Sequence, residues 1–74
     1  MTNEATKLIK LGLNVQKARK AKKLSQNALA DILDISREHL AKIETGKRRI
    51  SLKLLFLLSE VLEVPESELM CFIP

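Results

Sequence analysis

Side chains that can bind phosphate groups and base edges are concentrated between residues 37 and 49 of this 74-residue chain. Arg37, Glu38 and Lys42 occur at a spacing that would place them on one side of a helix. A guanidinium can bind the O6 and N7 atoms of guanine in two-pronged fashion, and a carboxylate can accept a hydrogen bond from the amino group of cytosine. The following run, residues 47–49, adds three positive charges. These residue types predict contact with a nucleic acid.

Each of these side chains also has a less specific role open to it. Arg37 can contact a phosphate instead of a base, and Glu38 can be a surface acid or the partner of Lys42 four residues on. The only histidine, His39, has no adjacent cysteine or second histidine. We therefore expect a partly exposed side chain on the DNA-facing side of the helix, and not a metal ligand or a catalytic group. We expect base contacts from the exposed side chains of this helix: Arg37, Glu38, His39 and Lys42.

Two short helices joined by a tight corner are predicted to position these side chains. Ser25 and Ser36 each suit an N-cap position, where a hydroxyl accepts from free backbone N–H groups. Small and apolar residues follow Ser25 at helical spacing, and the second helix runs from Arg37 to about Thr45. This pattern indicates a helix-turn-helix over about residues 25–45. An α-helix fits the major groove of a DNA duplex.

Three further helices are expected around this pair. One side of the first helix, which reaches about Lys22, carries Leu8, Leu11, Val15 and Ala18. Gly12 lies inside this pattern at a cost of about 1 kcal/mol relative to alanine, so it either permits a close helix contact or is simply tolerated. Ser51 can cap a fourth helix through about Glu63, and Pro65 suits the first position of a short last helix.

The charge is divided unevenly along the chain. Residues 1–53 carry all 13 Lys and Arg side chains against five acids, whereas residues 54–74 carry four acids and no base. A basic part and an acidic, apolar part indicate one side facing a polyanion and another facing protein. The alternative is a soluble helical protein with uneven surface charge. Five basic groups in residues 17–23 can contact phosphate or serve the C-terminal end of the first helix.

The fourth helix has more apolar side chains than one face can bury. Leu55, Leu58 and Leu62 form a stripe that closes the core, and Leu52 and Phe56 are expected to add to it. A second stripe and an apolar tail would be exposed on so small a domain unless another chain covers them. We therefore expect a homodimer surface within residues 54–74 that contains Leu54, Leu57, Val61, Leu69, Met70, Phe72 and Ile73. The alternative is that the tail folds back onto its own core.

Several classes of protein find no support in the sequence. Cys71 is the only cysteine, so neither an intrachain disulfide nor a cysteine-based metal site is expected. No glycine-rich phosphate loop, nucleophile elbow or ligand cluster points to an enzyme. We also find no signal peptide and no apolar run of the roughly 20 residues that a bilayer requires. We expect one cytoplasmic domain, residues 1–74, with no metal, cofactor, small-molecule ligand or membrane.

The motif residues together resemble a known family. They are Leu24-Ser-Gln-X-X-Leu-Ala, Ile35-Ser, Leu40-X-X-Ile-Glu-X-Gly-Lys-Arg and Ser51, and they resemble the Cro/repressor-type (XRE) helix-turn-helix domain. The similarity extends from about Leu11 to Leu69. It implies an all-α, five-helix, lambda-repressor-like fold that binds double-stranded operator DNA, commonly as a two-fold dimer.

The resemblance also implies roles for individual residues. Ala30 matches a small residue that lets the two motif helices approach, and Gln26 matches a residue that holds a phosphate. Arg19 and Glu44 match a largely buried ion pair between the first and third helices. Asn27 can be a phosphate ligand or a solvated amide. The full set expected to contact phosphate is Gln26, Asn27, Lys47, Arg48 and Arg49.

Two residues depart from the family pattern, since Asp34 and Glu63 stand where glycine is frequent. Aspartate tolerates the left-handed conformation better than most residues, so we expect the corner to survive at some energetic cost. Because Glu63 replaces that glycine, the sequence leaves open the residue at which the fourth helix ends. Neither change removes a DNA-contact position.

The sequence thus predicts a sequence-specific transcriptional regulator that represses by occupying a promoter, as a homodimer on a palindromic operator. An activating controller of a restriction–modification cassette, a phage Cro-like repressor and an antitoxin-type autoregulator share this architecture, and the sequence does not separate them. From another class, the alternative is a protein-interaction module that holds a partner on its apolar C-terminal surface.

Overall fold

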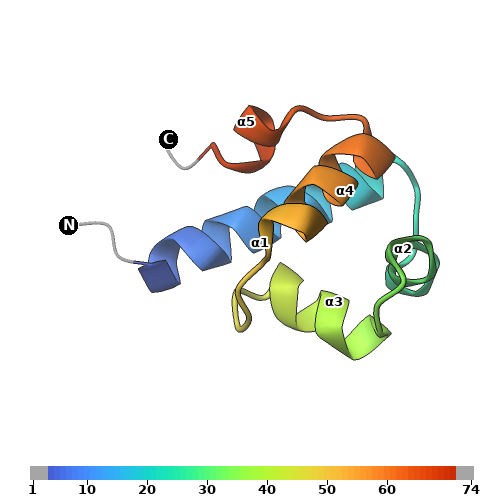
Figure 1. Cartoon of the computed structure of the whole chain (residues 1–74), viewed down its shortest axis with the longest axis horizontal. Coiled ribbons are helices and arrows are strands. Elements are labelled where there is room, and N and C mark those ends of the chain that lie inside the picture. Colours follow the sequence, from blue (N-terminus) through green and yellow to red (C-terminus); the bar gives the residue numbers. More distant parts are fainter. Residues whose placement is uncertain (1–3, 72–74) are drawn as a thin grey trace.

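Five α-helices make up the part of the chain that the computed structural model describes, residues 4–71, and this part contains no strand. Figure 1 shows α1 and α4 crossing at the centre, with α2 and α3 on one side and α5 on the other. The all-α, five-helix prediction is confirmed. The helices are α1 (Glu4–Ala21), α2 (Gln26–Leu33), α3 (Arg37–Glu44), α4 (Leu52–Leu62) and α5 (Glu66–Leu69).

Serine hydroxyl groups begin α2, α3 and α4, as their chemistry predicts. Each Oγ accepts a hydrogen bond from the backbone N–H three residues on, at 3.0 Å for Ser25 and Ser36 and 3.1 Å for Ser51. All three serines have extended backbone angles, which is the usual geometry of an N-cap. The starts of the two motif helices are therefore fixed by the local sequence.

Left-handed residues end α2 and α4. Asp34 has φ 59° and ψ 44°, and Glu63 has φ 57° and ψ 42°, so both adopt the conformation that glycine would take most easily. A third such residue, Lys23 with φ 60°, follows α1 and was not predicted. Each costs roughly 1–2 kcal/mol relative to a right-handed conformation. At Glu63 an ion pair with Lys22 accompanies this cost and joins the ends of α4 and α1.

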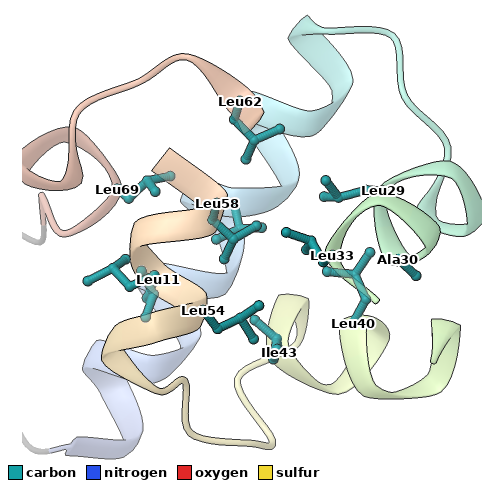
Figure 2. Close-up of a cluster of buried hydrophobic side chains, with 12 residues drawn as sticks. Leu11, Leu29, Ala30, Leu33, Leu40, Ile43, Leu54, Leu58, Leu62 and Leu69 are labelled. Atoms are coloured by element: carbon teal, nitrogen blue, oxygen red, sulfur yellow. The ribbon is translucent and has the colours of Figure 1, made fainter. Parts of the chain in front are cut away.

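Apolar side chains from all five helices meet in one core, and Figure 2 shows them pointing toward a common centre. Leucine dominates, so the core is aliphatic. The buried apolar residues are Leu11, Val15, Leu29, Ala30, Leu33, Leu40, Ile43, Leu54, Leu55, Leu58, Leu62 and Leu69.

The second apolar stripe of α4 does not form a free surface. Leu54 is buried in the core with 8% of its surface exposed, and Leu57 and Val61 are half-buried against the core. The end of α2 lies beside this stripe, because Leu33 and Leu54 line the same hollow. The expectation that Leu54 belongs to an exposed subunit surface is therefore wrong.

Two other residues of α4 take the exposed positions instead. Leu52 and Phe56, which were expected in the core, are 69% and 53% exposed. They lie one turn apart on the side of α4 that faces away from the buried residues. The error was one of helical phase: the core stripe of α4 is wider on the Leu54 side, because α2 covers that side.

The C-terminal segment folds back onto the domain. Leu69 is 1% exposed and lies in the core, so its assignment to a subunit surface is also wrong. The side-chain amide of Asn14 on α1 donates to the carbonyl oxygens of Leu69 at 2.8 Å and Cys71 at 3.1 Å, and these bonds hold α5 against α1. Met70 remains 46% exposed. The other two tail residues of the expected surface, Phe72 and Ile73, lie outside the described residues.

Gly12 lies where α1 and α3 approach most closely. A Cβ atom at this position would be 2.4 Å from the carbonyl oxygen of Ile43 and 2.5 Å from that of Glu44. These are backbone atoms at the end of α3, which cannot rotate away as a side chain can. Of the two explanations open from the sequence, close helix contact is therefore the one that the structure supports.

We expect Gly12→Ala to lower the free energy of unfolding by about 1–3 kcal/mol, because α3 must shift to admit the methyl group. This loss would exceed the gain of about 1 kcal/mol in helix propensity. Thermal and urea unfolding followed by circular dichroism measures it, with Lys17→Ala on the exposed side of α1 as the control. An unchanged or raised stability of Gly12→Ala would show that the contact is not tight.

Candidate nucleic-acid interface

Helix α3 turns its polar side outward and its apolar side into the core. Leu40 and Ile43 are buried, whereas Arg37, Glu38 and Lys42 are exposed. The structure thus brings the expected base-contacting residues to one accessible helix face. His39 lies at its edge and is half-buried, with its backbone N–H donating to Ser36 at the start of the helix.

A buried ion pair holds the back of α3 against α1. Arg19 Nε donates to Glu44 Oε2 at 2.7 Å, and Arg19 Nη2 donates to Glu44 Oε1 at 3.2 Å. The two residues are only 7% and 3% exposed. Arg19 Nη1 also donates to the carbonyl oxygen of Leu24 at 2.8 Å, which fixes the turn between α1 and α2. The pair implied by the family resemblance is thus formed, and it joins α1 to α3 and to the turn before α2.

Gln26 connects this ion pair with the exposed face of α3. Its Nε2 donates to Glu44 Oε1 at 3.0 Å, and its Oε1 accepts from Arg37 Nη1 at 3.4 Å. The family resemblance implies that Gln26 holds a phosphate, and the sequence does not indicate these two contacts. Each of the three residues was singled out separately, but only the packing of α2 against α3 shows that they adjoin. A chain of hydrogen bonds thus runs from Arg19 through Glu44 and Gln26 to the guanidinium of Arg37, and its last member is long and exposed.

The loop between α3 and α4 carries the cations that are expected to contact phosphate, residues 47–49. Gly46, with φ 76°, follows the cap of α3 and lies beside Ile9 of α1, where a Cβ atom would meet the Ile9 backbone at 2.7 Å. Lys47 and Arg48 are exposed and take part in none of the ion pairs found among residues 4–71. A shallow hollow runs from α3 along this loop to the start of α4, lined by His39, Lys47, Arg48, Arg49, Ser51 and Leu54. Side chains that can bind phosphate thus lie next to the exposed face of α3.

The remaining two residues expected to contact phosphate differ in their surroundings. Arg49 is paired with Glu4 at the start of α1, with Nη2 donating to Glu4 Oε1 at 2.9 Å. This guanidinium is already occupied by a carboxylate, unlike its two neighbours in the loop. Asn27 is exposed on α2, next to Gln26.

We expect Arg19→Met to lower the free energy of unfolding by about 3–5 kcal/mol, because it leaves the Glu44 carboxylate buried without its cation. For a chain of this size, that corresponds to a fall in melting temperature of more than about 10 °C. The matched control is Arg49→Met, which breaks the exposed pair with Glu4 and should cost less than about 1 kcal/mol. Equal effects of the two substitutions would contradict a structural role specific to the buried pair.

Within residues 4–71, no group of three or more His, Cys, Asp and Glu side chains is arranged to hold a metal ion. None of the helices described is both long and apolar enough to cross a lipid bilayer.

A helix pair with an outward-facing second helix and a flanking basic loop defines a helix-turn-helix protein. The sequence matches the family HTH_3, described as helix-turn-helix, over residues 15–69. This match covers most of the chain, and the chain belongs to that family. It is thereby placed in the class of DNA-binding transcriptional regulators.

Solved structures of the same fold include regulators from several bacteria. The restriction-modification controller protein C.AhdI from Aeromonas hydrophila is 34% identical, with a TM-score of 0.78 over 84% of this chain and 94% of that one. The clp gene regulator ClgR from Corynebacterium glutamicum is 22% identical, with a TM-score of 0.81 over 86% and 68%. The hypothetical transcription factor NHTF from Neisseria is 23% identical, with a TM-score of 0.81 over 95% and 80%. A search of curated proteins gives no match.

Proposed function

We propose that this chain is a repressor that binds a palindromic operator in double-stranded DNA as a homodimer and acts by occupying a promoter. The observation that carries the proposal is the exposed face of α3, where Arg37, Glu38 and Lys42 lie together with no role in the core. A bound protein blocks polymerase without any dedicated contact, which favours repression over activation. The single-domain organisation of residues 1–74 belongs to this proposal.

Base recognition would come from the N-terminal turns of α3 in the major groove. Arg37 would bind the O6 and N7 atoms of a guanine, and Glu38 would accept from a cytosine amino group. Gln26 would support the first of these contacts, because its Oε1 lies 3.4 Å from Arg37 Nη1 and can help to orient the guanidinium. Each such base contact contributes about 1–3 kcal/mol of discrimination. Lys42 and His39 would complete the reading surface further along the helix.

Affinity independent of sequence would come from the phosphate backbone. Lys47 and Arg48 are exposed beside α3, and Gln26 and Asn27 lie at the start of α2, where free backbone N–H groups favour a phosphate. Arg49 would join them only by leaving Glu4. Two-fold symmetry would place the half-sites about 34–36 Å apart along the duplex.

A second candidate is a controller of restriction–modification genes, which need not be a repressor. The similarity to C.AhdI supports it, because that protein is 34% identical over 84% of this chain. Both candidates require the same interface with DNA. They differ in whether the bound protein blocks or recruits polymerase, which transcription from the bound promoter distinguishes.

The test is a comparison of Arg37→Ala with Lys47→Ala on duplexes selected by the unaltered protein from a random pool. We expect Arg37→Ala to lose discrimination at one position of each half-site, by about 1–3 kcal/mol, because a base contact is removed. Lys47→Ala should weaken binding to all sequences alike and reduce the salt slope by about 0.9 for each phosphate that is no longer neutralised. Fluorescence anisotropy at several salt concentrations measures both effects.

A uniform loss for Arg37→Ala, with no change in base preference, would reassign that side chain to a phosphate. Failure of the unaltered protein to bind any duplex at low ionic strength would reject the proposed function altogether.

A further inference from the structure

One face of α4 is exposed and carries two large apolar side chains together with two charges. Leu52 and Phe56 are 69% and 53% exposed and lie one turn apart. Lys53 and Glu60 are exposed on the adjoining side of the same helix, seven residues apart. Neither of these charges belongs to an ion pair found among residues 4–71. The α4 face, as we call these four residues, thus combines a large apolar centre with two unneutralised charges of opposite sign.

The order of these residues along α4 matches a helix that packs against its own copy in antiparallel orientation. Lys53 and Glu60 lie at nearly equal distances on either side of Phe56. In an antiparallel pair centred there, the two copies of Phe56 would meet across the two-fold axis. Lys53 of each chain would then lie opposite Glu60 of the other. A parallel pair would instead set like charges against each other.

We propose that the α4 face is the contact surface between two copies of this chain. Charge complementarity identifies the occupant, because a surface that is complementary to itself under a two-fold rotation suits a second copy. Lys53 borders a hollow that it shares with His39 at the edge of α3, whereas Arg37, Glu38 and Lys42 do not line that hollow, so the pairing would leave these three side chains accessible. The inference rests on the proposed function for its homodimer, and it replaces the buried residues Leu54 and Leu69 as the origin of that dimer.

Charge reversal tests this surface most sharply. Lys53→Glu and Glu60→Lys should each raise the dimer dissociation constant about tenfold, because each change sets like charges together at two symmetric places. The double variant restores opposite charges and should return the constant to nearly its original value. Sedimentation equilibrium of the full chain at low ionic strength measures these constants. Asp31→Lys is the control, since it makes the same change of charge as Glu60→Lys on the exposed side of α2.

Phe56→Asp tests independently whether the apolar part of the α4 face contributes to the dimer. It should yield a monomer with unchanged helical content, because this side chain is not part of the core. Rescue by the double charge variant together with a monomeric Phe56→Asp would support the α4 face. A chain that is monomeric at every concentration, or a dimer indifferent to all three single changes, would overturn it.

The outcome is separable from that of the proposed function. A dimer that responds to charge reversal as expected but binds no duplex would support the α4 face and reject the regulator. Conversely, Phe56→Asp should still bind a single half-site, with weaker binding to the palindrome than the unaltered protein. If Phe56→Asp bound the palindrome as tightly as the unaltered protein, the α4 face would not be the contact between the DNA-bound subunits.

Discussion

The ion pair between Arg19 and Glu44, with the hydrogen bond from Gln26 to Glu44, sets the relative positions of α1, α2 and α3. Two opposite charges are taken out of water here, so each depends on the other for compensation and the geometry between them tolerates little change. The two side chains can meet because Gly12, which has no Cβ atom, lets the end of α3 approach α1 closely. Leu24 and Gln26 complete the hydrogen bonds around it. The orientation of α2 and α3 is therefore set by contacts on their buried side, while the outer face of α3 remains exposed.

This arrangement separates stability from recognition within α3. Leu40, Ile43 and Glu44 face inward and hold the helix, whereas Arg37 and Lys42 face outward and contribute nothing to the core. Substitutions on the outer face would therefore alter the proposed DNA contacts without changing the fold. Gln26 is the exception, because it touches both the buried pair and the outer face.

Much of this organisation could be predicted from local sequence. The serine caps, the left-handed Asp34 and the apolar spacing of α2 and α3 each depend on residues three or four positions apart. They can therefore be recognised in the sequence before the fold is known. The outer position of the charged α3 residues follows from the same periodicity.

The rest depends on contacts between distant segments, which no local pattern contains. The phase of α4 was misjudged because α2 covers the Leu54 side, leaving Leu52 and Phe56 exposed. Local patterns do not contain the contacts of Gln26 and Arg49 for the same reason, since each bonds to a residue of a helix elsewhere in the sequence. In a helix this rich in leucine, composition alone cannot say which apolar side chains face outward.

The exposed face of α3, with the basic loop beside it, is the surface that we propose meets DNA. Titration of an isotope-labelled chain with a duplex selected from a random pool, followed by NMR of the backbone amides, tests it directly. We predict that the largest shift changes fall on residues 37–42 and 47–48, with smaller ones at the start of α2. Changes centred on α4 and α5, with α3 unaffected, would contradict the account.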